Sequence, residues 1–402
     1  MSIQKPFRAV PIGEISEVNP KGPGKAKLKP DVELDFLPMA DLHEDGSVHV
    51  TVRRRYEEVA KGYTAFKDGD VLIAKITPCF ENNKIGVAKV KTEWAFGSTE
   101  YHVLRPSGRV DASYLTHFLR QDSVRNEGEK RMTGSGGQRR VPKAFVEDLQ
   151  IPLPPLEEQR RIAAILDQAD ALRRLRRTAI AKLSALGQSM FYEMFGDPVS
   201  NPMGWPEHRR LGEVSEIVSG ITKGRKLNGQ QTREVPYLAV VNVQDRHLCL
   251  APLKTIYATD AEIEKYKLKE NDLLLTEGGD PDKLGRGTLW RNEIPECIHQ
   301  NHVFRVRLKD VSISPVFLNW IVGSTRGKTY FLRSAKQTTG IASINMTQLK
   351  GFPLLIPPTE VQRKFEERIG QHEDLVTRLK ESERVFDNLV CSLQQRAFNG
   401  EL

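Results

Sequence analysis

Three residues in the second half of the chain, Cys297, His299 and His302, are of the types that bind zinc. On an alternating strand, Cys297 and His299 would share one face and His302 would lie on the other, so the three would not converge on one ion. We therefore expect no metal site here. His302 is expected to pack or to form hydrogen bonds beside a strand, as is His102 in the first half of the chain.

The sequence also offers no convincing set of catalytic residues. Glu277 and Asp280, with Lys283, imitate the carboxylate cluster of a nuclease, but acids at this spacing are common in turns. The chain has no glycine-rich nucleotide loop, and Asn201-Pro-Met-Gly204 lacks the second proline and the aromatic residue of an amino-methyltransferase motif. We predict that the chain contains no catalytic residue, binds no cofactor of its own and is not an enzyme.

Polar loops that contain glycine offer a different chemistry, which is hydrogen bonding to nucleic acid. Loops that combine Gly with Lys, Arg, Asn, Gln, Ser or Thr can contact both the base edges and the phosphates of a duplex. Each residue could equally belong to an ordinary solvated loop, so the prediction applies to the loops more than to single residues. The selected residues are Lys75, Thr77, Asn82, Asn83, Lys84, Ser135, Gln138, Arg139, Arg140, Thr222, Lys223, Arg225, Lys226, Glu277, Asp280, Lys283, Arg286, Gln337, Thr338 and Ser343.

The composition is compatible with a nucleic-acid partner. The chain has 402 residues and a formal net charge of +8, which suits a polyanion and exceeds the usual length of one domain. Its four cysteines stand far apart without CxxC pairing, which disfavours a zinc knuckle or a disulfide framework. No apolar run is long enough for a membrane span, and residues 1–10 lack the core of a signal peptide, so we expect a cytoplasmic protein.

The chain repeats one plan twice. Several segments recur in the same order, at offsets between 199 and 203 residues. A period this long indicates two similar domains, each followed by a similar element, rather than a solenoid. The matched segments are 12–18 with 211–217, 70–73 with 272–275, 102–105 with 302–305, 151–160 with 354–363, and 137–141 with 340–344.

Each copy opens with a globular stretch of short strands and a few helices. Its apolar runs are strand-like and are separated by Gly, Pro and Asn. The expected fold class is α+β, with two similar mixed α/β domains. Predicted strands cover residues 71–76, 85–90, 101–104 and 273–276, and predicted helices lie near 114–121 and 315–324.

Each copy closes with a long helix that starts after two prolines, Pro154-Pro155 or Pro357-Pro358. Apolar residues in both helices recur at steps of three, four and seven, with Arg176 filling the gap between Leu172 and Ala179, and this is the spacing of a helix pair. The economical arrangement is an antiparallel coiled coil with a pseudo-twofold axis, although each helix could instead pack on its own domain. The predicted helix-pair interface comprises Ile165, Ala169, Leu172, Ala179, Leu183, Leu186, Met190, Ile369, Val376, Leu379, Phe386, Leu389 and Leu393.

Together these features resemble the specificity subunits of Type I restriction–modification systems. The helix start Pro-Pro-x-Glu-x-Gln is the most specific sign, because it occurs twice at the period of the repeat. The likeness covers essentially the whole chain. The segments that carry it are 151–162 with 169–172, 195–198 with 204–205, 356–362, 395–402, and 274–287, which looks like a recurring motif of target recognition domains.

The resemblance implies that two target recognition domains each read one half of a bipartite DNA site, with the two helices as a spacer. It also implies two methylation subunits on the helical region, S-adenosylmethionine on those subunits, adenine N6 as the methyl acceptor, and two restriction subunits. The side chains at 137–141 and 340–344 differ, as two different half-sites require. The basic run 173–177 could face phosphates or an acidic surface of a methylation subunit, or could be a solvated helix face.

The implied domains are residues 1–155 and 207–357 for the two target recognition domains, 156–193 and 358–396 for the helices, 194–206 for a linker and 397–402 for a tail. Two alternatives stay open. One is an autonomous DNA methyltransferase or nuclease with an unrecognised site. The other is a coiled-coil scaffold that binds only protein.

Overall fold

The computed structural model describes residues 7–24, 28–135, 137–227, 229–279, 284–338 and 341–402. The chain divides into two compact units, one made of residues 1–180 with 379–402 and the other of residues 181–378. Two long helices, α5 (Leu156–Phe195) and α11 (Thr359–Asn399), contribute residues to both units. Within the described ranges, no helix is both long enough and apolar enough to cross a membrane.

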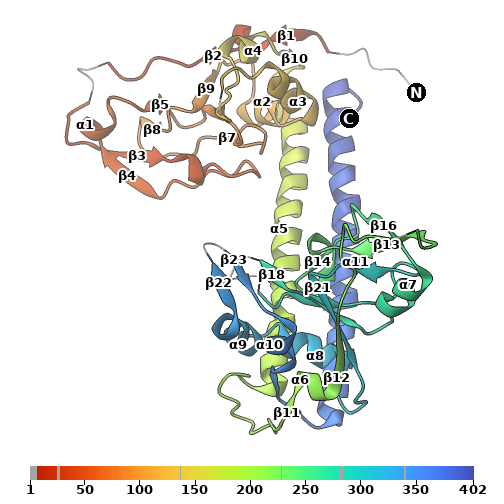
Figure 1. Cartoon of the computed structure of the whole chain (residues 1–402). Helices are drawn as coiled ribbons and strands as arrows, with labels where there is room; N and C mark the ends of the chain where they lie inside the picture. Colours follow the sequence, from red (N-terminus) through yellow and green to blue (C-terminus); the bar gives the residue numbers. More distant parts are fainter. Residues whose placement is uncertain (1–6, 25–27, 136, 228, 280–283, 339–340) are drawn as a thin grey trace. The chain divides into compact units, whose positions relative to one another are not determined.

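The first unit contains a four-stranded antiparallel sheet in the order β2-β9-β6-β7, with α2 packed on β6 and β7 (Figure 1). The central strand β6 is buried along its whole length, which explains its continuous apolar run. A second sheet has the order β4-β3-β8-β5. The elements are β1 (Ala9–Pro11), η1 (Ile12–Glu14), β2 (Ser16–Val18), β3 (Glu33–Leu37), η2 (Met39–Asp41), β4 (Val52–Arg55), α1 (Tyr56–Val59), β5 (Thr64–Phe66), β6 (Val71–Ala74), β7 (Ile85–Val87), β8 (Ala95–Gly97), β9 (Tyr101–Pro106), α2 (Ala112–Leu119), α3 (Asp122–Arg131), α4 (Lys143–Asp148) and β10 (Gln150–Pro152).

The second unit repeats this plan. Its four-stranded antiparallel sheet has the order β12-β21-β17-β19, and a second sheet has the order β16-β13-β20. A hairpin of β22 and β23 pairs with β18 (Figure 1). The elements are β11 (Arg209–Arg210), α6 (Leu211–Val214), β12 (Ser215–Ser219), β13 (Arg233–Leu238), η3 (Val240–Asn242), β14 (Val243–Gln244), β15 (His247–Leu248), β16 (Lys254–Ala258), α7 (Asp260–Tyr266), β17 (Leu273–Thr276), β18 (Gly278–Gly279), β19 (Gly287–Leu289), β20 (Ile298–His299), β21 (Val303–Leu308), α8 (Pro315–Val322), α9 (Thr325–Ser334), β22 (Lys336–Thr338), β23 (Ile341–Ser343), α10 (Met346–Lys350) and β24 (Pro353–Leu354).

The predicted mixed α/β domains are therefore present, and they share one strand order. Each predicted strand has a counterpart in β6, β7, β9 or β17, and the two predicted helices correspond to α2 and α8. Both helices begin at a side-chain cap. Asp111 accepts hydrogen bonds from the backbone N–H groups that open α2, and Ser314 does the same for α8, which has a proline at its first position.

Strand pairing fixes how the two domains correspond. Ile73 pairs with His102 in the first domain, whereas Leu275 pairs with Phe304 in the second. His102 therefore corresponds to Phe304, and the alignment of His102 with His302 on their shared sequence letters is wrong by two residues. A shift of two residues keeps each side chain on the same face of the strand, so the alternation of the sequence does not reveal the error.

The corrected register aligns two ion pairs. Arg105 Nε and Nη2 donate to the carboxylate of Asp70 at 2.9 and 2.7 Å. Arg307 Nε and Nη2 donate to the carboxylate of Asp272, both at 2.7 Å. Both aspartates are buried and also accept a backbone N–H from the residue three positions earlier. The same clamp therefore fixes the start of the central strand in both domains.

In the first unit, the N-terminal part of α5 and the C-terminal part of α11 run antiparallel. Arg173 Nε donates to Asp387 Oδ1 at 2.8 Å, and Arg177 Nε donates to Glu383 Oε1 at 3.1 Å. Later residues of α5 thus meet earlier residues of α11. Nearer its end, α11 packs into the core of the first domain through Phe398.

In the second unit, the remaining parts of the same helices also run antiparallel. His372 Nε2 lies 2.7 Å from the backbone oxygen of Leu183. The rings of Phe191 and Phe195 lie 5.6 and 5.1 Å from the ring of Phe365. These aromatic residues belong to the core cluster of the second domain, so the helix pair is continuous with that core.

The phase of the helix interface differs from the expected one. Leu172, Leu186 and Leu389 were expected in the interface but are 52%, 46% and 60% exposed, so these assignments are wrong. On α5, the residues that face the partner helix are Arg173 and Gly187, each one position after the predicted Leu172 and Leu186. A search for apolar residues passes over an arginine and a glycine in the seam. The assignment of Ala179 is wrong for the same reason, because it is exposed. Of the other predicted residues, Ala169, Met190, Ile369 and Val376 are buried, and Ile165, Leu183, Leu379, Phe386 and Leu393 are partly buried.

Candidate nucleic-acid interface

A buried glutamine joins the first domain to the start of α5. Gln159 is completely buried, and its side-chain oxygen accepts a hydrogen bond from the backbone N–H of Asp111 at 2.9 Å. Its amide nitrogen donates to the backbone oxygens of Arg109 and Pro154 at 3.0 and 2.8 Å. One side chain thus ties together the loop before α2, the proline turn and the first turn of α5.

The second domain uses the same connection. Gln362 is completely buried, and its side-chain oxygen accepts from the backbone N–H of Ser314 at 2.8 Å. Its amide nitrogen donates to the backbone oxygens of Ser312 and Pro357 at 3.2 and 2.7 Å. The repeated Pro-Pro-x-Glu-x-Gln sequence therefore has a physical purpose, because it fastens each domain to the beginning of a long helix.

At the end of the central strand, the first domain carries a charged cluster of Lys75, Glu100 and Arg140. Arg140 Nε and Nη2 donate to the two oxygens of Glu100 at 2.9 and 2.8 Å. The side-chain hydrogen bond with Arg140 lowers the pKa of Glu100, so the pair is fully charged at neutral pH. Arg140 is 41% exposed and Glu100 is 23% exposed, so the pair is held in place but open to solvent on one side.

The second domain carries Glu277, His302 and Ser343 at the end of its central strand. His302 Nδ1 lies 2.6 Å from Glu277 Oε2, and the His302 side chain is 55% exposed. Ser343 pairs through its backbone with Gly278, next to Glu277. His302 thus forms hydrogen bonds beside a strand, as the sequence predicted for it, but it does so in the open and with a carboxylate.

His102 is also a hydrogen-bonding group beside a strand, as expected, but unlike His302 it is buried. Asn19 Nδ2 lies 3.2 Å from His102 Nδ1, and His102 Nε2 lies 2.9 Å from the backbone oxygen of Val141. If the Asn19 amide donates, the ring proton is on Nε2 and is donated to Val141. Burial lowers the pKa of His102, so the ring is neutral at pH 7. It fixes the segment next to Arg140 through Val141 and adds no charge at the surface.

The other loop residues selected in the first domain fall into two groups. Five of them contact their own domain through Glu81, Glu44 or backbone oxygens. Ser135 and Gln138 are exposed on the turn before Arg140. The contacts run from Thr77 to Glu81 at 2.9 Å, from Asn82 to Glu44 at 2.9 Å, from Asn83 to the oxygen of Arg120 at 3.4 Å, from Lys84 to the oxygen of Met39 at 3.1 Å, and from Arg139 to Glu81 at 3.8 Å.

Some of the residues selected in the second domain contact their own domain, and others are exposed. Arg225 forms a bidentate contact with Glu262, which lowers the pKa of that carboxyl to about 2, and Arg286 Nη1 donates to Gln244 at 2.9 Å. Thr222, Lys223 and Lys226 are exposed. The backbone of Gln337 and Thr338 lies in β22, and Asp280 and Lys283 lie outside the described residues.

The basic run 173–177 is engaged within the chain. Besides the contacts of Arg173 and Arg177 with α11, Arg176 Nη2 donates to Ser382 at 2.6 Å and Arg174 lies 3.9 Å from Asp45. None of the interpretations offered from the sequence included this arrangement. The apolar and charged patterns of one helix do not show which acids a distant helix brings beside it.

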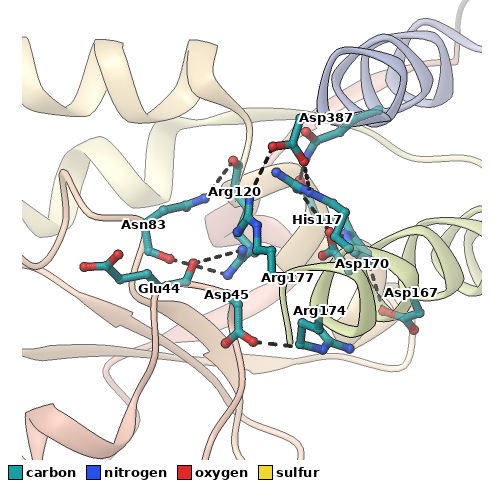
Figure 2. A network of polar contacts seen from close by, with 12 residues as sticks. Glu44, Asp45, Asn83, His117, Arg120, Asp167, Asp170, Arg174, Arg177 and Asp387 are labelled. Carbon is teal, nitrogen blue, oxygen red and sulfur yellow. Dashed lines mark hydrogen bonds and ion pairs between the residues drawn. The ribbon is translucent and has the colours of Figure 1, made fainter. Parts of the chain in front are cut away.

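Figure 2 shows the polar network around Arg120, in which α5 meets two loops of the first domain. Arg120 donates to the backbone oxygens of Glu44 and Ile85 at 3.1 and 3.0 Å. His117 Nε2 lies 2.8 Å from Asp167 of α5. Burial lowers the pKa of Arg120, and both of its terminal nitrogens donate to backbone oxygens. This network holds the first domain against α5 along a second line of contact.

The zinc-like trio does not form a cluster. Cys297 and His299 are buried, and His299 Nδ1 lies 2.7 Å from the backbone oxygen of Val303, whereas His302 pairs with Glu277 at the surface. Across the part of the chain that the structure describes, no group of three His, Cys, Asp or Glu side chains could hold a metal ion.

Sequence reasoning missed three contributors to these sites. Gln159 and Gln362 were visible as repeated letters, but their role depends on the loop that each one meets in space. Glu100 was passed over because it is acidic and not in a glycine loop, although it orients Arg140.

Comparison with known proteins identifies a family. The family described as Type I restriction modification DNA specificity domain matches residues 4–185 and again residues 202–384. A relative in Escherichia coli, the Type I restriction enzyme EcoEI specificity subunit, is 24% identical over 98% of this chain and 84% of its own length. The EcoAI specificity subunit from Escherichia coli is 43% identical, but over 37% of this chain and 25% of its own length.

A solved structure shares the fold. It comes from work on complex assembly and conformational transition of the type I R-M system, and it matches with a TM-score of 0.65, 19% identity and full coverage of both chains. The two copies found by the family match agree with the two domains of like strand order described above. With both of its halves matched, this chain belongs to the family of Type I restriction–modification DNA specificity subunits.

Proposed function

We propose that this chain is the non-catalytic, sequence-reading subunit of a Type I restriction–modification enzyme. Each mixed α/β domain reads one half of a bipartite site in double-stranded DNA, and the two long helices act as the spacer. The observation that carries the proposal is that two domains of one strand order are each fastened to a long helix by a buried glutamine, Gln159 or Gln362, while their exposed strand ends differ.

Partner subunits carry the chemistry in this proposal. Two methylation subunits hold S-adenosylmethionine and methylate adenine N6, and two restriction subunits complete the nuclease, all in the cytoplasm. Exposed apolar side chains on the helices support a protein contact there. Leu172 and Leu175 of α5 and Val385 and Leu389 of α11 are between 52% and 67% exposed.

The decisive experiment is methylation by the reconstituted complex. The chain is co-expressed with Type I methylation subunits from its source organism in a host that lacks other methyltransferases, and methylated adenines are mapped across the genome. We expect one bipartite motif with a fixed spacer. The purified chain alone should transfer no label from S-adenosylmethionine to DNA. Transfer by the chain alone, or the absence of any bipartite motif, would refute the proposal.

Salt dependence distinguishes DNA reading from a scaffold role. Binding of a duplex that contains the mapped motif should weaken steeply as salt rises, because phosphate contacts release counterions. The measurement uses the full complex in a fluorescence titration at several salt concentrations. Binding that is absent, or indifferent to salt, would favour a scaffold that contacts only protein.

A further inference from the structure

The polar clusters at the two strand ends occupy the same backbone positions. In the first domain, Lys75 N donates to Glu100 O at 2.9 Å, and Arg140 forms an isolated antiparallel bridge with Ile76, the residue after Lys75. In the second domain, Glu277 N donates to His302 O at 3.0 Å, and Ser343 pairs with the residue after Glu277. Positions 75, 100 and 140 therefore correspond to positions 277, 302 and 343.

The framework that carries these positions recurs in both domains. The clamp of Asp70 with Arg105 recurs as Asp272 with Arg307, and the buried Gln159 recurs in the second copy. At the three strand-end positions the chemistry changes completely. Lys, Glu and Arg in the first domain are replaced by Glu, His and Ser in the second. A shared frame that presents different polar groups is what two readers of different sequences require.

The first cluster presents hydrogen-bond donors. Glu100 holds Arg140 through Nε and Nη2, and Arg140 Nη1 donates to the backbone oxygen of Gln138 at 3.1 Å. A guanidinium has more N–H donors than these contacts use, and its plane is already fixed. Lys75, which directly follows β6, adds a second positive group. Donors in a fixed plane match the O6 and N7 acceptors of guanine in the major groove.

The second cluster presents an acceptor. Glu277 Oε2 lies 2.6 Å from His302 Nδ1, which orients the carboxylate. A carboxylate can accept several hydrogen bonds, so this contact leaves it able to accept another. An acceptor of this kind matches an amino group on a base edge, which cytosine carries at N4 and adenine at N6.

We infer that these equivalent clusters are specificity-determining sites, with Arg140 reading a guanine in one half-site and Glu277 reading the amino group of a cytosine or adenine in the other. The inference rests on the proposed function, since it assigns bases to the two domains. Under this inference, three positions determine the base preference of each domain. They can be substituted while Gln159 and Gln362, which fasten the domains to the helices, stay unchanged.

The test is the base preference of the reconstituted methylation complex on a library of duplexes in which each position of the mapped motif is varied. Arg140→Ala should lower discrimination at one guanine of one half-site by roughly tenfold or more, and should leave the other half-site unchanged. Glu277→Ala should relax one cytosine or adenine position of the other half-site by a similar factor. Glu277→Gln separates the two bases, because glutamine pairs with adenine and would keep that preference but lose cytosine.

Matched controls keep the result interpretable. Arg131 is a 55% exposed arginine paired with Glu127 in the same domain as Arg140, and Glu264 is an exposed carboxylate on α7. Arg131→Ala and Glu264→Gln should keep the wild-type preference at every position. Thermal unfolding of each variant shows whether it folds. If the wild type writes a bipartite motif and both Arg140→Ala and Glu277→Ala keep its base preferences, the inference fails and the proposed function stands. If the wild type writes no bipartite motif, the proposed function itself fails.

Discussion

The side-chain oxygen of Gln159 accepts the backbone N–H of Asp111 at 2.9 Å, in the loop where Asp111 also caps α2. Two consecutive contacts thus connect α5 to α2 through one residue. Ser314 stands in the same relation to Gln362 and α8 in the second domain. Both glutamines are completely buried, so each of their hydrogen bonds matters more than it would at the surface.

Removing either glutamine should destabilise its own domain. Gln159→Ala leaves one backbone N–H and two backbone oxygens without their partner, and unsatisfied buried groups cost about 1–3 kcal/mol each before relaxation. We expect a loss of about 2–4 kcal/mol in the free energy of unfolding, measured by chemical denaturation. Gln168→Ala, at an exposed position of the same helix, is the control and should change stability little.

The Asp70–Arg105 pair should behave as a coupled unit. Asp70 is 3% exposed at its side chain and Arg105 is 28% exposed, so Asp70→Ala leaves a largely buried positive charge without its partner. Breaking such a pair costs about 3–5 kcal/mol, whereas removing both members costs less than the sum of the single changes. A double-mutant cycle in urea, with Arg105→Met as the second change, measures the coupling. If the loss of stability in the double variant equalled the sum of the losses in the two single variants, the pair would not be coupled.

Acid should weaken the second domain before its carboxylates titrate. Burial lowers the pKa of His299 from 6.5 to about 4. The unfolded chain takes up a proton as the pH falls through 6.5, but the folded chain does so only near 4. Stability from this group is therefore complete above pH 6.5 and is lost progressively down to pH 4, by about 3 kcal/mol.

Urea unfolding between pH 7.5 and 4 tests this expectation. His299→Asn keeps a polar side chain but has no titrating ring, so its stability should fall less over that interval than the stability of the wild type. The buried His102 titrates in the same direction but lies in the first domain, so part of the pH dependence of the whole chain remains in this variant. His208→Asn, at an exposed site, should keep the wild-type slope. An unchanged slope in His299→Asn would show that the buried ring is not responsible.

Local sequence signals predicted the elements, but not the partners that each element meets. The buried runs at β6 and β17 and the helix starts after two prolines were evident from apolar pattern and proline position. The alignment of His102 with His302 failed because matching letters carry no information about which residues pair across strands. The ion pair of Arg105 with Asp70 identifies the true register, and it becomes visible only in the fold.

The helix interface shows the same limit. The spacing of Leu172 and Leu186 suits a heptad as well as the spacing of Arg173 and Gly187 does. The two leucines are also more hydrophobic, so the sequence favours them as interface residues. The structure selects the second set because Arg173 finds Asp387 and because the bulky Trp320 needs the space that Gly187 leaves. Both reasons involve residues more than 100 positions away, so neither could be read from one helix.

Two glycines inside the long helices should respond in opposite ways to the same substitution. A Cβ at Gly187 would lie 2.9 Å from Trp320 and 3.2 Å from Ile369, both of which are buried, whereas a Cβ at Gly370 would meet nothing within 4 Å. Alanine in place of glycine in a helix gains about 1 kcal/mol from propensity, but overpacking against a rigid indole costs about 1–3 kcal/mol. We expect Gly370→Ala to stabilise the second unit and Gly187→Ala to destabilise it. Paired denaturation curves measure both, and stabilisation by Gly187→Ala would show that this part of the helix seam is looser than its contacts indicate.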